Sequence, residues 1–353
     1  MITDQDIKKI LDDAVFAPSG ENCQPWRFEV KDSILYVIND SLADLSVYNF
    51  ELRGSYIAHG ALIENISISA SELGYDAKMK LFPDNTNADL VAIIEFKSAD
   101  NILPDSLSQF VRTRCTNRKA YSGKTLSSDI KQSLRTAVKM PENKVSFVDD
   151  PEKMKVLGAV AALNEKILFE NKSLHDFFYS HILWDESRQD ATGFYYKTLE
   201  FLPHQLPLVK LLKNWKILDA MNRYLGISRV IAKDNAKKYA GSGTFFSLTM
   251  PDTSRESFIG LGRSFQRFWL ASTVNNLALQ PCTGVLFFEQ RIKSGDNSSF
   301  TDIQIKEIEA AHVKMTKTFS PANELTIGMF GRIGYANSPS GRATRRSPVV
   351  SFK

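Results

Sequence analysis

The sequence has little cysteine: Cys23, Cys115 and Cys282 are the only three among 353 residues. They match no metal-ligand spacing and are odd in number, so we expect a reducing compartment rather than a disulfide framework. The chain also lacks an apolar run of the roughly 18 residues that a membrane helix needs. Met1 leads directly into an amphipathic pattern without the apolar core of a signal peptide. These absences predict a soluble, cytoplasmic protein without a membrane partner.

The net charge is small, and the common catalytic motifs are missing. The 44 Lys and Arg against 40 Asp and Glu leave a net charge of only +4, too mild to indicate a nucleic-acid partner. The sequence contains no Gly-x-Ser-x-Gly elbow, no Gly-x-Gly-x-x-Gly and no phosphate-binding loop. Its five histidines show no metal-ligand spacing with Cys or carboxylates. Hydrophobic residues make up 43%, which allows a core for one large domain or two small ones.

A polar loop at residues 17–26, with the sequence APSGENCQPW, separates a predicted helix from a predicted β-hairpin. Ser19 and Asn22 offer uncharged hydroxyl and amide groups, and Gly20 lets a ligand approach the backbone. A loop of this composition suits hydrogen bonding to a flat polar ring. Taken alone, Pro18 and the residues after it are equally typical of a helix stop followed by a turn.

The order of predicted elements repeats once along the chain. Each half has an amphipathic helix ending near a proline, a strand, a long apolar helix and another strand; the long helices are predicted at 55–73 and 257–279. The polar loop occurs only in the first half, whereas an arginine-rich segment at 112–121 occurs only in the second. We therefore predict two degenerate copies of one α+β unit, at residues 1–104 and 105–353.

The loop and the arginine segment resemble those of the nitroreductase-like flavoproteins. Proteins of this family are usually homodimers with two FMN sites, and each site takes arginines from one subunit and a Pro-Ser loop from the other. The resemblance implies a nitroreductase-like α+β fold in which the two copies form an intramolecular pseudo-dimer with one FMN site. It covers most of the chain but is vague between about 150 and 240. The expected oligomeric state is a monomer or a weak homodimer.

The resemblance also implies roles for the arginine segment. Arg114-x-Thr116-x-Arg118 resembles the family pattern Arg-x-Ser-x-Arg/Lys, so Arg114 and Thr116 would hold the phosphate and ribityl side of FMN. Arg118 would reach the pyrimidine edge of the ring. Cys115 departs from the pattern, which often has a second basic residue there, and one extra residue precedes Tyr121. A solvated surface is the alternative interpretation of this cluster.

Two further segments complete the resemblance. Arg345 and Arg346 resemble a C-terminal basic pair that binds phosphate, with Arg342 as a substitute if the register slips. Residues 281–284 resemble a turn whose backbone N–H groups face flavin N5. Taken alone, these would be an ordinary tail and an ordinary helix end. The predicted cofactor ligands are Pro18, Ser19, Gly20, Asn22, Arg114, Thr116, Arg118, Pro281, Thr283, Gly284, Arg345 and Arg346. No catalytic side chain and no metal ligand is predicted, because the flavin itself supplies the redox step.

The function that the resemblance implies is NAD(P)H-linked reduction of a small electrophile, such as a nitro compound or a quinone, through flavin N5. The alternative is an FMN-sequestering or storage protein with little turnover. It is motivated by the irregular, aromatic segment 184–215, which is too long for a plain connection and which we expect to be a lid insertion. Packing on the outside of the second half is the other interpretation of that segment. A flavin-free interaction protein is a third, weaker option.

Overall fold

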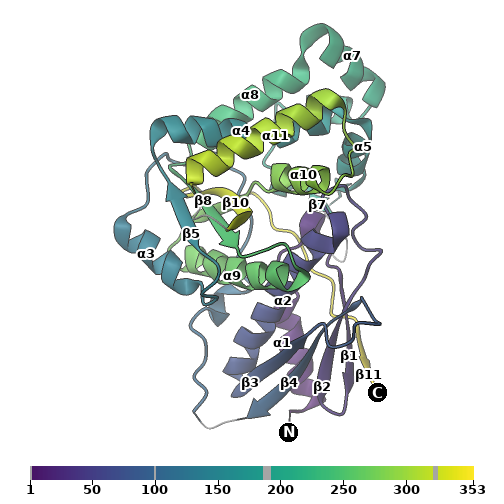
Figure 1. The fold of residues 1–353 in the computed structure, drawn as a ribbon, viewed down its shortest axis with the longest axis vertical. Helices are drawn as coiled ribbons and strands as arrows, with labels where there is room; N and C mark the ends of the chain where they lie inside the picture. Colours follow the sequence, from purple (N-terminus) through teal and green to yellow (C-terminus); the bar gives the residue numbers. More distant parts are fainter. Residues whose placement is uncertain (1, 99–100, 186–191, 321–324) are drawn as a thin grey trace.

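The computed structural model describes residues 2–98, 101–185, 192–320 and 325–353. It is an α+β protein, as the sequence predicted, with the first sheet at one end of the molecule and a mainly helical region at the other (Figure 1). Within the described residues, no helix combines the length and the apolar character that crossing a membrane would need.

The first half forms one sheet with two helices. The first helix starts at a capping box, in which the Thr3 side chain accepts from Asp6 N and the Asp6 carboxylate accepts from Thr3 N. The second helix is buried over most of its circumference, which explains its lack of a polar face. In chain order the elements are α1 (Asp4–Ala14), η1 (Gly20–Asn22), β1 (Trp26–Lys31), β2 (Ile34–Asn39), η2 (Phe50–Leu52), α2 (Arg53–Glu72), β3 (Tyr75–Leu81) and β4 (Leu90–Ser98).

The second half repeats this plan with two helical insertions. Its repeated elements are α3 (Ser128–Ala137), β5 (Val145–Val148), β8 (Thr244–Met250), α9 (Arg255–Val274), β9 (Ala278–Pro281) and β10 (Thr326–Gly334). A short η3 (Ser108–Phe110) precedes them. The first insertion holds α4 (Pro151–Glu170), α5 (Lys172–Ser180), β6 (Ile182–Leu183), β7 (Phe194–Tyr195), η4 (Tyr196–Leu199), α6 (Leu206–Leu212), α7 (Trp215–Leu225) and α8 (Ile227–Ala240). The second holds α10 (Gly284–Lys293) and α11 (Asp302–Phe319).

The two sheets have the same topology. Strand order is β1-β2-β4-β3 in the first half and β5-β8-β10-β9 in the second, and every neighbouring pair in these orders is antiparallel. In both halves the long helix connects the second strand of the chain to the third. This shared order confirms the prediction of two tandem, degenerate copies. The boundary between residues 104 and 105 remains a prediction.

The long helices α2 and α9 meet where each carries a glycine. A Cβ added to Gly60 would lie 2.2 Å from the Ile259 carbonyl oxygen, and one added to Gly262 would lie 2.1 Å from the Ile57 carbonyl oxygen. The step from the first residue of the helix to this glycine is the same in both, from Arg53 to Gly60 and from Arg255 to Gly262. The two backbones therefore touch at equivalent positions, where only glycine fits.

The end of the chain returns to the first half. Strand β11 (Val350–Phe352) pairs in parallel with β1, with Phe28 opposite Val350, and extends the first sheet to five strands. The segment between β10 and β11 runs down the molecule from the upper sheet to the lower one (Figure 1). A strand that follows the repeated elements of the second half thus completes the sheet of the first.

Some local predictions were wrong. Residues 285–288 were expected to be extended but lie in α10, because a short apolar run does not distinguish a strand from a buried helix. The second long helix ends at Val274 rather than near 279, and the chain turns at Asn276, which has φ 54°, before entering β9. Strand β3, which alternates half-buried and exposed residues, was missed.

Candidate functional site

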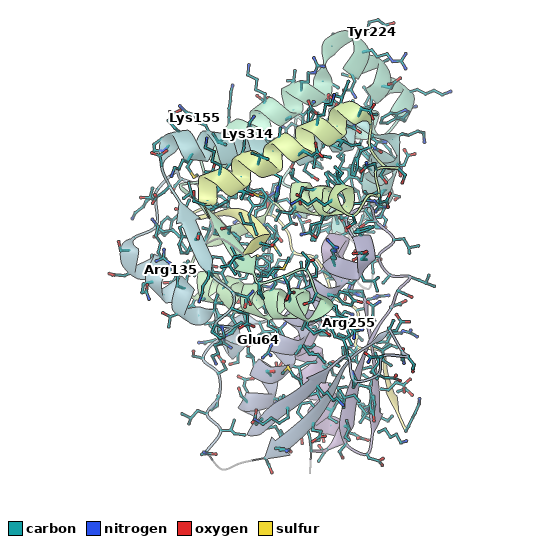
Figure 2. The ribbon with its side chains drawn as sticks, in the orientation of Figure 1. Glu64, Arg135, Lys155, Tyr224, Arg255 and Lys314 are labelled. Carbon is teal, nitrogen blue, oxygen red and sulfur yellow. The ribbon has the colours of Figure 1, made fainter. Side chains whose placement is uncertain are left out.

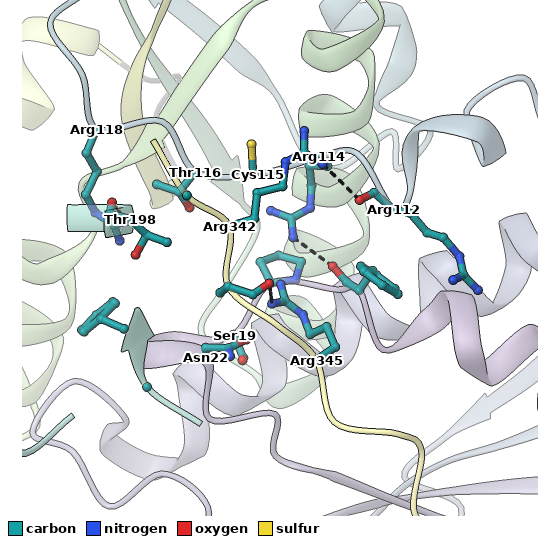
Figure 3. Close-up of a pocket in the computed structure, with 16 residues that line it drawn as sticks. Ser19, Asn22, Arg112, Arg114, Cys115, Thr116, Arg118, Thr198, Arg342 and Arg345 are labelled. Carbon is teal, nitrogen blue, oxygen red and sulfur yellow. Dashed lines mark hydrogen bonds between the residues drawn. The ribbon is translucent and has the colours of Figure 1, made fainter. Parts of the chain in front are cut away.

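A cavity of about 190 Å³ lies where the two halves meet (Figure 3). Its walls come from the polar loop, the arginine segment, the start of β7 with η4, and the tail before β11. The lining residues are Phe16, Pro18, Ser19, Asn22, Arg112, Arg114, Cys115, Thr116, Arg118, Gly193, Phe194, Thr198, Gly341, Arg342, Ala343 and Arg345. Both copies of the fold therefore contribute to one site.

The polar loop is held in a strained conformation. Glu21, Asn22 and Gln24 have φ values of 45°, 58° and 53°, and non-glycine residues in this region cost about 1–3 kcal/mol each. The loop is tied by a bond from Gln24 N to Ser19 Oγ at 3.0 Å, and the Asn22 amide donates to the Thr344 carbonyl of the tail at 3.1 Å. Asn22 Oδ1 is buried and has no partner within the described part of the chain. That oxygen is available to accept a bond from a ligand.

Arg114 joins the arginine segment to the loop. Its guanidinium donates to the Phe16 carbonyl at 2.9 Å and lies 4.3 Å from the centre of the Trp269 ring. The residue is 6% exposed, and its Nε has no partner among the described residues. Burial, with the nearby charge of Arg345, lowers the pKa of Arg114 to about 9. Keeping Arg114 charged in this buried position therefore costs free energy, and a bound anion would offset that cost.

The tail supplies a second cation, the half-buried Arg345. Arg345 Nη1 donates to the carbonyls of Ala343 and Thr344, while its Nε is buried without a partner in the described regions. Burial lowers the pKa of Arg345 to about 10. Five arginines line the cavity, and none of its described lining residues is Asp or Glu. Because buried guanidinium groups without carboxylates are costly, this arrangement favours an anionic ligand.

The cations lie at two ends of the cavity. Figure 3 shows Arg118 and Thr198 at one side, Arg112, Arg114 and Arg342 at the other, and Ser19 and Asn22 below with Arg345. Arg118 Nη1 donates to the Thr198 carbonyl at 3.0 Å, and its guanidinium is 5.4 Å from the centre of the Phe194 ring. Burial lowers the pKa of Arg118. An elongated ligand could therefore meet a cation at each end.

Some predicted ligands line the cavity and others do not. Those that line it are Pro18, Ser19, Asn22, Arg114, Thr116, Arg118 and Arg345. Those outside its described lining are Gly20, Pro281, Thr283, Gly284 and Arg346. Arg346 instead ties the tail to the loop, because its Nη2 donates to the carbonyls of Cys23 and Gln24 at 3.2 Å each. Gly284 packs against Asn164, since a Cβ there would lie 2.0 Å from Asn164 Oδ1. Contact between these residues and a cofactor stays a prediction.

Part of the segment that we expected to be a lid lies beside the cavity. Gly193, Phe194 and Thr198 belong to the lining, and the Glu200 carboxylate accepts bonds of 2.6 and 2.7 Å from Ser340 N and Oγ in the tail. Residues 186–191 of the predicted lid lie outside the described residues. The segment thus contacts the cavity, although lid movement is untested.

Sequence reasoning missed Phe16, Gly341 and Ala343 among the lining residues, and it assigned no role to Arg112. Phe16 directly precedes the loop and Arg112 begins the arginine segment, so proximity to the motifs could have indicated both. No neighbouring motif indicates Gly341 or Ala343. Cys23, by contrast, is a buried neighbour of the site: burial raises the pKa of its thiol well above the usual value, and its Sγ lies 3.9 Å from Asp44 Oδ2.

Two proteins of Mycobacterium tuberculosis (strain CDC 1551 / Oshkosh) are similar in sequence. "Uncharacterized protein MT1398" is 20% identical over 336 residues, which cover 94% of this chain and 46% of that protein. "Putative NAD(P)H nitroreductase acg" is 24% identical over 206 residues, which cover 58% of this chain and 59% of that protein. This chain therefore spans about half the length of these curated relatives. A scan of protein families gave no matching family model.

Solved structures show a fainter likeness. A "putative nitroreductase" from Anabaena variabilis aligns with 94% of this chain and 88% of its own, with a TM-score of 0.46 and 11% identity. Other similar structures are nitroreductases crystallised with bound FMN, with TM-scores of 0.35. These scores are too low to support a conclusion about ligands. The sequence relatives include proteins named as putative NAD(P)H nitroreductases, in agreement with the resemblance of the loop and the arginine segment.

Proposed function

We propose that the chain binds one FMN in the cavity between its halves and uses it for NAD(P)H-linked reduction of a small electrophile such as a nitro compound or a quinone. The observation that carries this proposal is the buried guanidinium group of Arg114 together with the half-buried one of Arg345. Each has an unpartnered Nε among the described residues, and no carboxylate stands among the described residues that line the cavity. A phosphate dianion is the partner that such forked donors fit best.

The remaining lining residues suit the rest of the cofactor. Ser19, Asn22 and Thr116 offer neutral donors and acceptors for ribityl hydroxyls or ring edges. Arg118, at the other end, would stabilise negative charge on the pyrimidine side of the ring. FMN, when bound, supplies the hydride chemistry. The chain's own residues bind and orient it, and Phe194 contributes an apolar part of the wall.

An FMN-sequestering role is the second candidate, and the contact of the 193–200 region with the cavity favours it. The bonds between Glu200 and Ser340 fasten this region to the tail. Steady NADH or NADPH oxidation with a nitro or quinone acceptor would support the reductase. Retained FMN with no turnover would support sequestration.

The proposal is tested by titrating the apoprotein with FMN and with riboflavin, which lacks the phosphate. Two charge-assisted bonds at about 1.5–3 kcal/mol each should make FMN bind at least about a hundredfold more tightly. Equal affinity for the two flavins would show that the arginines do not hold the phosphate. No binding of either would overturn the proposed function.

A further inference from the structure

The positive charge of the chain is concentrated in the helices of the first insertion. Residues 206–240 contain eight Lys or Arg and two Asp, a surplus of six, whereas the whole chain has a surplus of four. The rest of the chain is therefore net negative. Lys210, Lys213, Lys216, Arg223, Arg229, Lys233 and Lys237 are all exposed. Because the net charge of the whole chain is only +4, it gave no indication of this cluster.

Large apolar side chains are exposed within the same region. Tyr224 and Leu225, at the end of α7, are 84% and 67% exposed, and Val230, in the first turn of α8, is 48% exposed. We call residues 223–233 the basic apex. Figure 1 places α7 at the end of the molecule opposite the first sheet, and Figure 2 shows Tyr224 at its outer limit. The apex therefore projects from one end of the molecule, where a flat surface can reach it.

The apex is a fixed structure, and its exposed side chains are not needed for the core. Gly226, with φ 61°, ends α7 and begins α8, so the chain reverses there. Asn222 donates to the Phe169 carbonyl at 2.6 Å, and Ser228 Oγ donates to Glu170 at 2.7 Å, which anchors the reversal on α4. A separate set of residues fills the core beneath: Leu218, Met221, Ile227 and Ile231 pack with Tyr179 and Leu212.

The charge of the apex is mostly unpaired. Arg223 forms an ion pair with Asp219 at 2.6 Å. Arg229 and Lys233 have no ion-pair partner in the parts of the chain that the structure describes. A rigid projection that combines exposed aromatic and aliphatic side chains with unpaired cations complements an anionic lipid surface, which offers phosphate charge and an apolar phase together. Duplex DNA offers phosphate charge, but its apolar base faces are already stacked on one another.

We propose that the basic apex docks the protein peripherally on membranes that contain anionic phospholipid. Tyr224 and Leu225 enter the interface, while Arg229 and Lys233 contact lipid phosphates. The inference is independent of the proposed reductase function, because the apex residues do not belong to the lining of the cavity. It revises the expectation of no membrane partner, which rested on the average charge and on the lack of a spanning helix.

The test is co-sedimentation of the full chain with vesicles of phosphatidylcholine alone and with vesicles in which about a third of the lipid is phosphatidylglycerol. We expect binding only to the anionic vesicles and its loss at high salt. Arg229→Glu with Lys233→Glu, and separately Tyr224→Ser with Leu225→Ser, should each weaken binding at least tenfold. Circular dichroism and thermal unfolding verify that the variants fold, and Arg229→Gln with Lys233→Gln is the milder substitute.

Matched controls lie elsewhere on the surface. Lys80→Glu with Lys97→Glu makes the same charge change on exposed residues of the first sheet, and Leu103→Ser removes a leucine that is 84% exposed. Both should bind anionic vesicles like the wild type. The proposal is overturned if the protein binds neutral vesicles equally well or binds no vesicles. It is also overturned if the control variants lose as much vesicle binding as the apex variants. Binding to duplex DNA without binding to vesicles would also overturn it.

Discussion

The Arg114 guanidinium donates to the Phe16 carbonyl at 2.9 Å, which joins the first part of the second copy to the segment after α1 of the first. Asn22 makes a second such link, to the carbonyl of Thr344 in the tail. The candidate site is thus built across the copies, and neither copy holds a complete set of its residues. The first two predictions follow from this division.

One FMN per chain is expected after reconstitution. The arginine segment and the polar loop each occur once, so the pseudo-symmetric position has no matching set of side chains. The measurement is flavin absorbance released from a known amount of denatured protein. A ratio near two would show that the second position also binds.

Arg114→Ala should weaken FMN binding more than Asn22→Ala. Losing a charge-assisted bond costs about 1.5–3 kcal/mol, and losing a neutral one about 0.5–1.5 kcal/mol. Titration of each apoprotein with FMN gives the two affinities. Arg27→Ala, on the exposed side of β1, is the matched control and should bind normally. Wild-type affinity in both site variants would argue against the assigned site.

Gly262→Ala should destabilise the fold. The added Cβ would lie 2.1 Å from the Ile57 carbonyl oxygen and 3.0 Å from Gly60 Cα, so α2 and α9 would have to separate. Overpacking of this kind costs about 1–3 kcal/mol or more. Gly260→Ala, in the same helix, is the control: its nearest neighbours are 3.8 Å away, and helix propensity should stabilise it by up to about 1 kcal/mol. Urea unfolding measures the stability of the two variants. Similar effects of both substitutions would contradict the close contact between α2 and α9.

Acid should weaken the fold through His59. The residue is fully buried on α2, its Nε2 lies 3.1 Å from Asn39 Oδ1, and burial lowers its pKa to about 3. In the unfolded chain a histidine has a pKa near 6.5, so the unfolded state binds more protons below that value. The stability contributed by neutral His59 is therefore present above about pH 6.5 and is lost as the pH falls toward 3.

Between pH 7 and pH 5 this loss should be about 2 kcal/mol in the free energy of unfolding. Urea unfolding at the two pH values measures it. His59→Gln can still bond Asn39 but does not titrate, so its stability should fall by less over the same interval. An equal fall in variant and wild type would mean that other groups dominate the acid response.

Sequence patterns predicted the features that depend on neighbouring residues. The long apolar runs of α2 and α9 and the isolated loop and arginine motifs all carry local signals. The path of the tail could not be predicted, because its bonds join residues such as Asn22 and Thr344 that are far apart in the chain. The structural role of Arg346 follows from that path, so the sequence alone could not separate it from Arg345.

The pairing of β11 with β1 has a consequence for synthesis on the ribosome. Strand β1 emerges early with an open edge, and its parallel partner, opposite Phe28 at Val350, is made only after both copies have been translated. An open edge is a place where other chains can add, so the nascent first copy is exposed to aggregation until the tail arrives. The same tail carries Arg345, so completion of the cavity and closure of that edge both depend on this last part of the sequence.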